Sequence, residues 1–197
     1  MSSSEPANLR ERIIEEATRL FVSLGYHAVS MREIAEAAGV SKAGLYYHFK
    51  DKESLLLAIL TANLDRIAGI VAQARPPGAT AREQIGWILR SIFQQPPEQR
   101  AIIRLSSQEM AHLSEVDRAE FGHLYRERFT GALEAILRAG IERGELRSMD
   151  ARVATWVLLG MAYPFLYSVH ERELGPPGDA IELMLSIFFD GASVPGE

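Results

Sequence analysis

The segment formed by residues 30–49 constrains the fold of this chain more than any other stretch. Ser30 and Glu33 have the spacing of a capping box, in which both side chains satisfy free N–H groups at the start of a helix. Gly39 permits a turn with positive φ, and Ser41 is suited to cap the helix that follows. A short helix, a tight turn with glycine and a second helix make a helix-turn-helix pattern.

Helix signals continue along the chain, and no stretch shows sustained alternation of apolar and polar residues, as a half-buried strand would. Asn8 with Glu11 and Thr80 with Glu83 repeat the capping-box spacing. Proline and glycine breaks lie at 75–78, 94–97 and 175–178. We therefore expect an all-α protein of about nine helices. Besides the helix that begins after Ser41, they are expected at 9–24, 31–38, 52–74, 80–94, 97–113, 116–143, 151–172 and 179–190.

The composition limits the possible classes of protein. A chain of 197 residues, 47% of them hydrophobic, can bury a substantial core, and the absence of cysteine excludes disulfides and thiolate metal sites. The N-terminus lacks the pattern of a signal peptide, and the longest uncharged run, 153–169, is short for a bilayer span. We expect a cytoplasmic protein without a membrane partner. No P-loop, nucleophile elbow or glycine-rich dinucleotide motif occurs, so we predict no enzyme and no catalytic residues.

All three lysines lie in the short stretch from Lys42 through Lys50 to Lys52, although the chain carries a net charge of −5. They surround the run Tyr46-Tyr47-His48, directly after the turn of the helix-turn-helix pattern. Residues 1–53 hold seven basic and eight acidic side chains, so this segment is not basic as a whole. Any contact with nucleic acid must therefore come from the local cluster.

The stretch "RIIEEATRLFVSLGYHAVSMREIAEAAGVSKAGLYYHFKDKESLLLAIL", residues 12–60, resembles the DNA-binding domain of the TetR family of transcriptional regulators. The resemblance implies an N-terminal three-helix DNA-binding domain, which we place at residues 8–68. It also implies a larger helical domain for effector binding and dimerisation, which we place at 69–197. The resemblance implies a homodimer that reads a palindromic operator. It also implies a repressor that a small effector releases from DNA. The alternative is a dimeric DNA-binding regulator that binds no effector and has an activating or structural role.

The candidate DNA-binding residues follow from the resemblance and from the chemistry of the cluster. Small residues at the start of a recognition helix let it approach base edges, while hydroxyl, imidazole and ammonium groups can contact phosphates. The predicted set is Ser30, Arg32, Ser41, Lys42, Ala43, Gly44, Tyr46, Tyr47, His48, Lys50 and Lys52.

The helices of the C-terminal part supply aromatic residues that could line a mostly apolar pocket with a few polar groups. Each of these aromatics could also be ordinary core. We expect no cofactor, and an apolar or amphipathic effector such as a fatty-acyl compound or an aromatic metabolite. The predicted effector-binding set is Trp87, Phe93, Arg104, Gln108, Phe121, Tyr125, Phe129, Trp156, Met161, Tyr163 and Phe165.

The last two predicted helices are apolar most of the way round, as expected for helices buried on two sides, one of them against a second subunit. Two such helices from each subunit would form a four-helix bundle. The predicted dimer interface is Val153, Val157, Gly160, Ile181, Met184, Leu185, Phe188 and Phe189.

One metal-like pattern is incomplete. Glu109 and His112 have the E-x-x-H spacing that places both side chains on one helix face. The dimetal bundles that use this pair need a second E-x-x-H and further glutamates, which the sequence lacks, so we predict no metal site.

Overall fold

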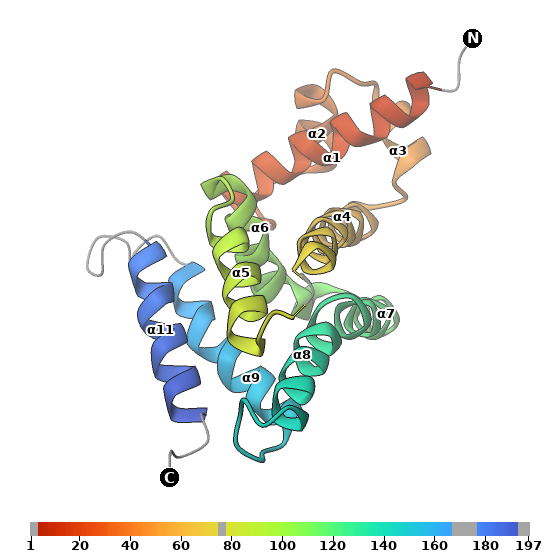
Figure 1. Ribbon diagram of the computed structural model, residues 1–197. Helices are drawn as coiled ribbons and strands as arrows, with labels where there is room; N and C mark the ends of the chain where they lie inside the picture. The colour runs from red at the N-terminus through yellow and green to blue at the C-terminus, as the bar shows by residue number, and fades with distance from the viewer. Residues whose placement is uncertain (1–3, 75–77, 167–176, 193–197) are drawn as a thin grey trace. The chain divides into compact units, whose positions relative to one another are not determined.

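The computed structural model describes residues 4–74, 78–166 and 177–192, and these residues form helices and no strand (Figure 1). The prediction of an all-α chain is therefore confirmed. The N-terminal helices are α1 (Ser4–Leu24), α2 (Met31–Ala37), α3 (Lys42–His48) and α4 (Lys52–Gln73). They are followed by α5 (Ala81–Phe93), α6 (Pro97–Glu109), η1 (Met110–His112), α7 (Glu115–Tyr125), η2 (Arg126–Thr130), α8 (Gly131–Glu142), α9 (Ala151–Ala162), η3 (Tyr163–Leu166) and α11 (Pro177–Ala192). The last part of the helix predicted at 151–172 lies outside the described residues.

The chain divides into two compact units. The first contains Met1–Asn63 and Ala101–Phe121, and the second contains Leu64–Arg100 and Gly122–Glu197. The domain boundary predicted from the sequence, at residue 68, assigns all helices before it to one domain and all helices after it to the other. In contrast, the contacts group most of α6, all of η1 and the first part of α7 with the N-terminal helices. Contacts between residues 101–121 and the N-terminal helices join distant parts of the chain, so no local sequence pattern predicts them.

The helix starts expected from capping pairs are mostly confirmed. The Ser30 hydroxyl accepts from the Glu33 N–H at 3.3 Å, and the Glu33 carboxylate accepts from the Ser30 N–H at 2.7 Å. Thr80 and Glu83 form the same reciprocal box at α5. The expected cap at Asn8 is wrong, because α1 begins at Ser4 and continues through this position.

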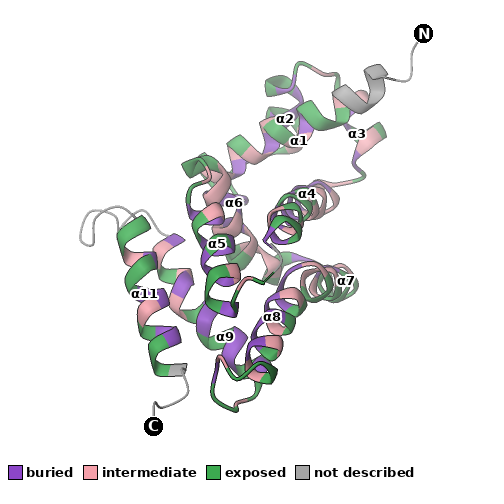
Figure 2. Ribbon diagram, in the orientation of Figure 1, coloured by how far each residue is buried: buried purple, intermediate pink, exposed green. Residues whose placement is uncertain are grey.

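The first unit buries one face of each of its short helices (Figure 2). The buried positions recur every three or four residues, which brings them to one side of a helix. Along α1 to α3 they are Ile13, Ala17, Phe21, Ile34, Ala35, Leu45 and, just after α3, Phe49. The sharp turn between α2 and α3 is made by Gly39 with φ of 62°, a conformation that glycine adopts without strain. This packing fixes the orientation of α3.

The second unit is a bundle in which α5 contacts α8 and α11, and α9 contacts α8 and α11. Its buried side chains are branched aliphatics and phenylalanines, among them Ile85, Ile88, Leu133, Leu137, Leu158, Ile181, Leu185 and Phe189. Two predicted long helices are interrupted in this unit. Residues 126–130 form a π-helical segment, and the α-helix before Pro164 ends at Ala162 and continues as the 3₁₀ segment η3. Proline has no N–H, so Pro164 cannot donate to the carbonyl oxygen of Gly160 one turn earlier, and the α-helical hydrogen-bond pattern ends there.

Gly131 ends the π segment and gives a stability prediction. A Cβ atom there would lie 2.7 Å from the Arg126 carbonyl oxygen, too close to be accommodated without moving backbone. Gly131→Ala should lower the free energy of unfolding by about 1–3 kcal/mol. Gly122→Ala in α7 is the control, since a Cβ there has open space and alanine favours the helix by about 1 kcal/mol. Urea unfolding followed by circular dichroism measures both, and equal stability of the two variants would contradict the role of Gly131.

One described helix, α4, is long and apolar enough to cross a membrane by length and composition alone. Of its most apolar stretch, 44% is buried inside the protein. Leu55, Leu56, Ile59 and Leu60 on this helix are almost completely buried. A core helix of a protein passes the same test of length and composition.

Candidate nucleic-acid interface

Helix α3 is held by its own cap and by two buried side chains. The Ser41 hydroxyl accepts from the Gly44 N–H at 3.0 Å, which satisfies a free donor at the helix start. Leu45 and Phe49 are buried, and the guanidinium of Arg10 lies 5.2 Å from the centre of the Phe49 ring. The opposite side of the helix is consequently left free for a partner.

The exposed side of α3 carries most of the predicted DNA-binding residues. Lys42, Ala43 and Lys50 are exposed, and the Tyr47 side chain is 84% exposed. Tyr46 is also exposed, with the Lys42 ammonium 5.9 Å from its ring centre. The two remaining members on this helix are half-buried, namely Gly44 and His48. The structure therefore brings a small residue, two cations and aromatic hydroxyls together on one short exposed helix and its following residues.

At the start of α2, Ser30 and Arg32 are exposed but already have intramolecular partners. The Ser30 hydroxyl is shared within the capping box, and the hydrogen bonds that it and its N–H donate keep the pKa of Glu33 below its ordinary value. The guanidinium of Arg32 lies 3.6 Å from the Glu36 carboxylate in an exposed ion pair, and a DNA phosphate could replace Glu36 as the partner of Arg32. Both positions remain compatible with phosphate contact.

Lys52 has partners within its own chain. Its ammonium donates to the Val29 carbonyl oxygen at 2.7 Å and lies 4.3 Å from the centre of the Tyr26 ring. Burial lowers the pKa of Lys52, which is the expected effect of desolvation on an ammonium group. The side chain ties the start of α4 to the turn between α1 and α2, and these contacts favour a structural role over the predicted phosphate contact.

Lys50 and Lys52 should therefore respond differently to substitution. Lys50→Ala should reduce the slope of log affinity against log salt concentration by about 0.9 for each phosphate that the lysine neutralises. Lys52→Ala should leave that slope unchanged and lower the free energy of unfolding by about 1–2 kcal/mol, because the hydrogen bond and the cation–π interaction disappear. Salt titrations of operator binding and urea unfolding separate the two effects. Equal changes in slope would contradict this distinction.

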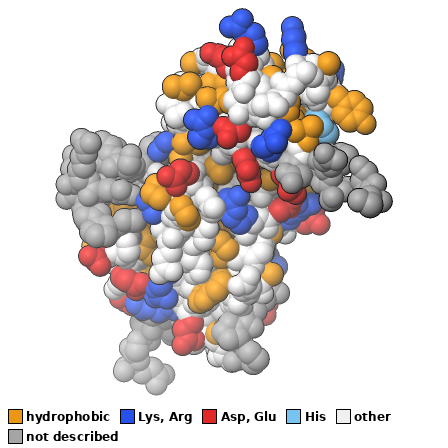
Figure 3. Space-filling model, turned by 90° about the horizontal axis from the view of Figure 1, so that it is seen from above, with side chains coloured by type: hydrophobic (Ala, Val, Ile, Leu, Met, Phe, Trp, Pro, Cys, Tyr) orange, Lys and Arg blue, Asp and Glu red, His pale blue; other side chains and the backbone are white. Residues whose placement is uncertain are grey.

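Acidic and basic side chains are interspersed on the face shown in Figure 3, instead of forming one continuous basic patch. This agrees with the near balance of charges in residues 1–53. Affinity for a polyanion should consequently depend on a few positions and on the pairing of two copies.

In the second unit, three of the predicted effector-binding residues are brought together. The hydroxyl oxygens of Tyr125 and Tyr163 lie 3.0 Å apart, and the Phe129 ring stands edge-on to Tyr125 with centres 5.5 Å apart. Burial raises the pKa of Tyr125, with a smaller contribution from Tyr163. The result is a polar pair within an apolar environment, next to the π segment η2, and π segments are frequent at functional sites.

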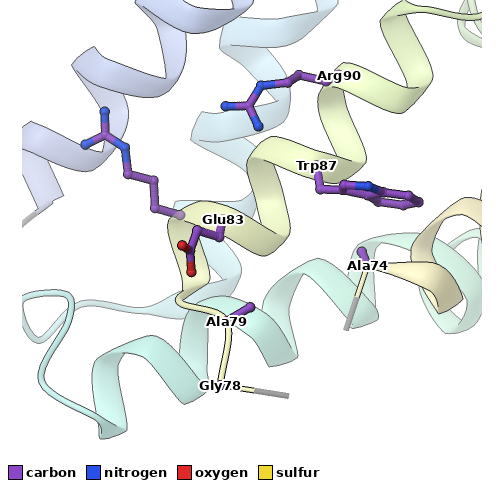
Figure 4. A pocket seen from close by; sticks show the side chains of 7 residues that line it. Ala74, Gly78, Ala79, Glu83, Trp87 and Arg90 are labelled. Atoms are coloured by element: carbon purple, nitrogen blue, oxygen red, sulfur yellow. The ribbon is translucent and has the colours of Figure 1, made fainter. Parts of the chain in front are cut away.

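Trp87 lines a separate hollow of about 540 Å³ (Figure 4). Its ring extends from α5 toward Ala74, while Glu83 lies one turn earlier on the same helix. The basic residues of this hollow, Arg82 and Arg90, are paired with Asp190 and Glu182 of α11. This hollow is more polar than the predicted pocket.

The other predicted effector residues are dispersed. Phe93 and Phe121 are buried, Arg104 is half-buried and Gln108 is exposed. Met161 and Phe165 line shallow hollows that also involve α11, and Trp156 is exposed on α9, so these three do not share the interior of the bundle with Tyr125. The sequence could not separate them, because α9 is apolar on both of its sides.

The predicted dimer set divides in the same way. Val153, Val157 and Gly160 lie on the exposed side of α9, as an interface requires. The five members on α11 are buried within their own chain, which argues against their predicted place in an interface: Ile181, Met184, Leu185, Phe188 and Phe189. The exposed apolar residues of α11 are instead Leu183 and Ile187, at 63% and 58% exposure. The sequence alone does not separate these two from the buried five, because the helix is apolar most of the way round.

The comparisons with known proteins agree with this arrangement. Residues 13–59 match the family model of bacterial regulatory proteins of the tetR family, and residues 78–163 match a model of the tetracyclin repressor-like C-terminal domain. The chain is 28% identical to the HTH-type transcriptional repressor KstR2 of Rhodococcus jostii, over 98% of this chain and 95% of that protein.

Two solved structures add to these findings. The TetR family regulator PfmR of Thermus thermophilus is 31% identical, with 90% of this chain and 94% of that chain covered and a TM-score of 0.70. The structure of AibR in complex with isovaleryl coenzyme A and operator DNA has a TM-score of 0.73 at 24% identity, over 92% of this chain and 98% of that chain. At this identity the second likeness concerns the fold.

Proposed function

The chain belongs to the TetR family of bacterial transcriptional regulators, and from this premise we propose that it is a ligand-responsive repressor acting as a homodimer on a palindromic operator. It acts in the cytoplasm, where operator DNA is accessible. A small apolar or amphipathic effector, bound in the second unit, releases it from DNA. We propose no catalytic role.

The observation that carries the proposal is the exposed side of α3. A recognition helix needs small side chains near its start, where base edges approach, and Ala43 and Gly44 occupy these positions. Tyr47 and Lys50 are placed to contact phosphate and sugar, which set affinity and register. Because Leu45 and Phe49 anchor the helix from behind, this side remains in place without a ligand.

The exposed apolar residues of α9 and α11 support the homodimer. Val153, Trp156 and Val157 on α9 and Leu183 and Ile187 on α11 are large apolar side chains that remain uncovered in one chain. Apolar side chains gathered in this way are typical of interaction surfaces. Two copies would bury them in a four-helix bundle and would present two recognition helices to the halves of a palindrome.

The half-buried Tyr125–Tyr163 pair supports an effector of largely apolar character. Two hydroxyl groups 3.0 Å apart can redirect their hydrogen bonds to a carbonyl or hydroxyl of a ligand, while Phe129 contributes apolar contact. The solved structure of AibR holds isovaleryl coenzyme A. We propose a fatty-acyl compound or an aromatic metabolite as the effector, and no cofactor.

The test has two stages. Selection of bound fragments from random DNA by the purified protein should recover a palindromic sequence, and recovery of no specific sequence would contradict the repressor proposal. Mobility-shift titrations with acyl-coenzyme A esters of different chain length and with aromatic acids should then release the DNA. If DNA is bound specifically but none of these compounds releases it, the proposed effector class is wrong and the regulator without an effector is favoured.

A further inference from the structure

Three metal-binding side chains meet in the first unit, although they come from distant parts of the sequence. They are His27, in the turn between α1 and α2, Glu109, the last residue of α6, and His112, the last residue of η1. All three belong to the first compact unit. The E-x-x-H pair of the sequence thus gains a third ligand from residue 27, which no local pattern could indicate.

The distances between the three donor atoms fit one tetrahedral metal ion. His27 Nε2 lies 3.1 Å from His112 Nε2, and Glu109 Oε2 lies 3.7 Å from the first nitrogen and 3.6 Å from the second. Zinc bonds of about 2.0–2.2 Å in a tetrahedron place neighbouring ligand atoms about 3.4 Å apart. A point equidistant from these three atoms lies about 2 Å from each of them, which is a zinc bond length.

Hydrogen bonding among the three side chains leaves the site unsatisfied. Only one of two neutral imidazole nitrogens can donate to the other, so the pair of histidines makes a single bond. Among the described residues, Glu109 Oε2 is buried and has no hydrogen-bond partner, since both imidazoles are too distant. The Lys52 ammonium interacts with this carboxylate electrostatically but donates no hydrogen bond to this oxygen. A buried carboxylate oxygen without a hydrogen-bond donor is costly, and a divalent ion would satisfy it together with both nitrogens.

The surroundings favour a fixed cation site with one open position. The buried Tyr26 ring packs on both imidazoles, nearly parallel to His112 at 6.4 Å between centres and edge-on to His27 at 5.3 Å. The histidine side chains are 67% and 45% exposed, so water can complete the coordination.

We propose that His27, Glu109 and His112 form a binding site for a divalent transition-metal ion, with zinc as the ion that this donor set suits. Two imidazoles and one carboxylate are ligands that zinc, cobalt and nickel share, whereas magnesium prefers oxygen donors. The bound ion links the turn that precedes the DNA-facing Ser30 to the end of α6 and to η1. This metal site is separate from the proposed repressor function, and metal binding can be measured in the absence of DNA and effector.

The direct test is titration of the full-length protein, without a histidine tag, with zinc, cobalt and magnesium chloride. Calorimetry should give one zinc site per chain, and cobalt should give the intense visible absorption of a four-coordinate ion that zinc abolishes. His27→Ala and His112→Ala should each weaken zinc binding by at least about 10-fold. His123→Ala, which removes an exposed histidine from α7, should bind zinc as the unaltered chain does.

Thermal unfolding without metal checks the fold of each variant, and zinc should raise the melting temperature of the unaltered chain but not of His27→Ala. The proposal is overturned if zinc does not bind, if magnesium binds equally well, or if folded His27→Ala and His112→Ala keep the full zinc affinity.

Discussion

The double substitution Leu183→Glu with Ile187→Glu is expected to give a folded monomer whose operator affinity is lower by about 100-fold or more. Both side chains are exposed on α11, at 63% and 58%, so glutamates cost little within one chain. In a dimer the same glutamates would be buried opposite their counterparts, and unpaired buried charges are strongly unfavourable. Loss of the dimer leaves each recognition helix to bind half of the operator alone. Sedimentation velocity and mobility shifts measure the two effects.

The control for this prediction is Val116→Glu. Val116 is an exposed apolar residue of α7, and its substitution also places a glutamate at an exposed apolar position, but on a helix of the first unit. That variant should remain dimeric and bind the operator normally. A double variant that sediments as a dimer would show that the interface lies elsewhere on the surface.

Tyr47→Ala is expected to weaken operator binding by about 10- to 100-fold and to leave the free energy of unfolding nearly unchanged. Its side chain is 84% exposed, so it contributes little to the packing of the unit. A tyrosine that contacts phosphate or sugar carries binding energy of about 1–3 kcal/mol, which corresponds to this decrease in affinity. Fluorescence anisotropy with labelled operator measures the affinity, and urea unfolding measures the stability.

Leu45→Ala is the matched contrast on the same helix. Leu45 is completely buried, so its truncation should lower the free energy of unfolding by about 2–5 kcal/mol, because apolar burial decreases and a cavity remains. The folded fraction of this variant should bind DNA normally, so its apparent affinity should fall only in proportion to the fraction that is unfolded. If Tyr47→Ala binds DNA normally while folded, the exposed side of α3 is not the recognition surface.

Much of the fold could be predicted because its signals are local. The capping pairs at Ser30 and Thr80, the glycine turn at Gly39 and the spacing of Leu45 and Phe49 involve residues no more than a few positions apart. A local signal can also be wrong, as at Asn8, where the capping spacing is present but α1 begins one turn earlier. The π segment before Gly131 could not be predicted, because its sequence is compatible with an ordinary α-helix.

The sequence by itself determined the all-α class, the helix-turn-helix and the residues that α3 exposes, because helix periodicity and caps are short-range interactions. Only the tertiary structure decided which side of the all-round apolar α11 faces outward. It likewise assigned Lys52 to the Val29 carbonyl, 23 positions away, and brought His27 to His112, 85 positions away. Contacts between distant segments depend on how whole helices pack, and no spacing along the chain records that packing.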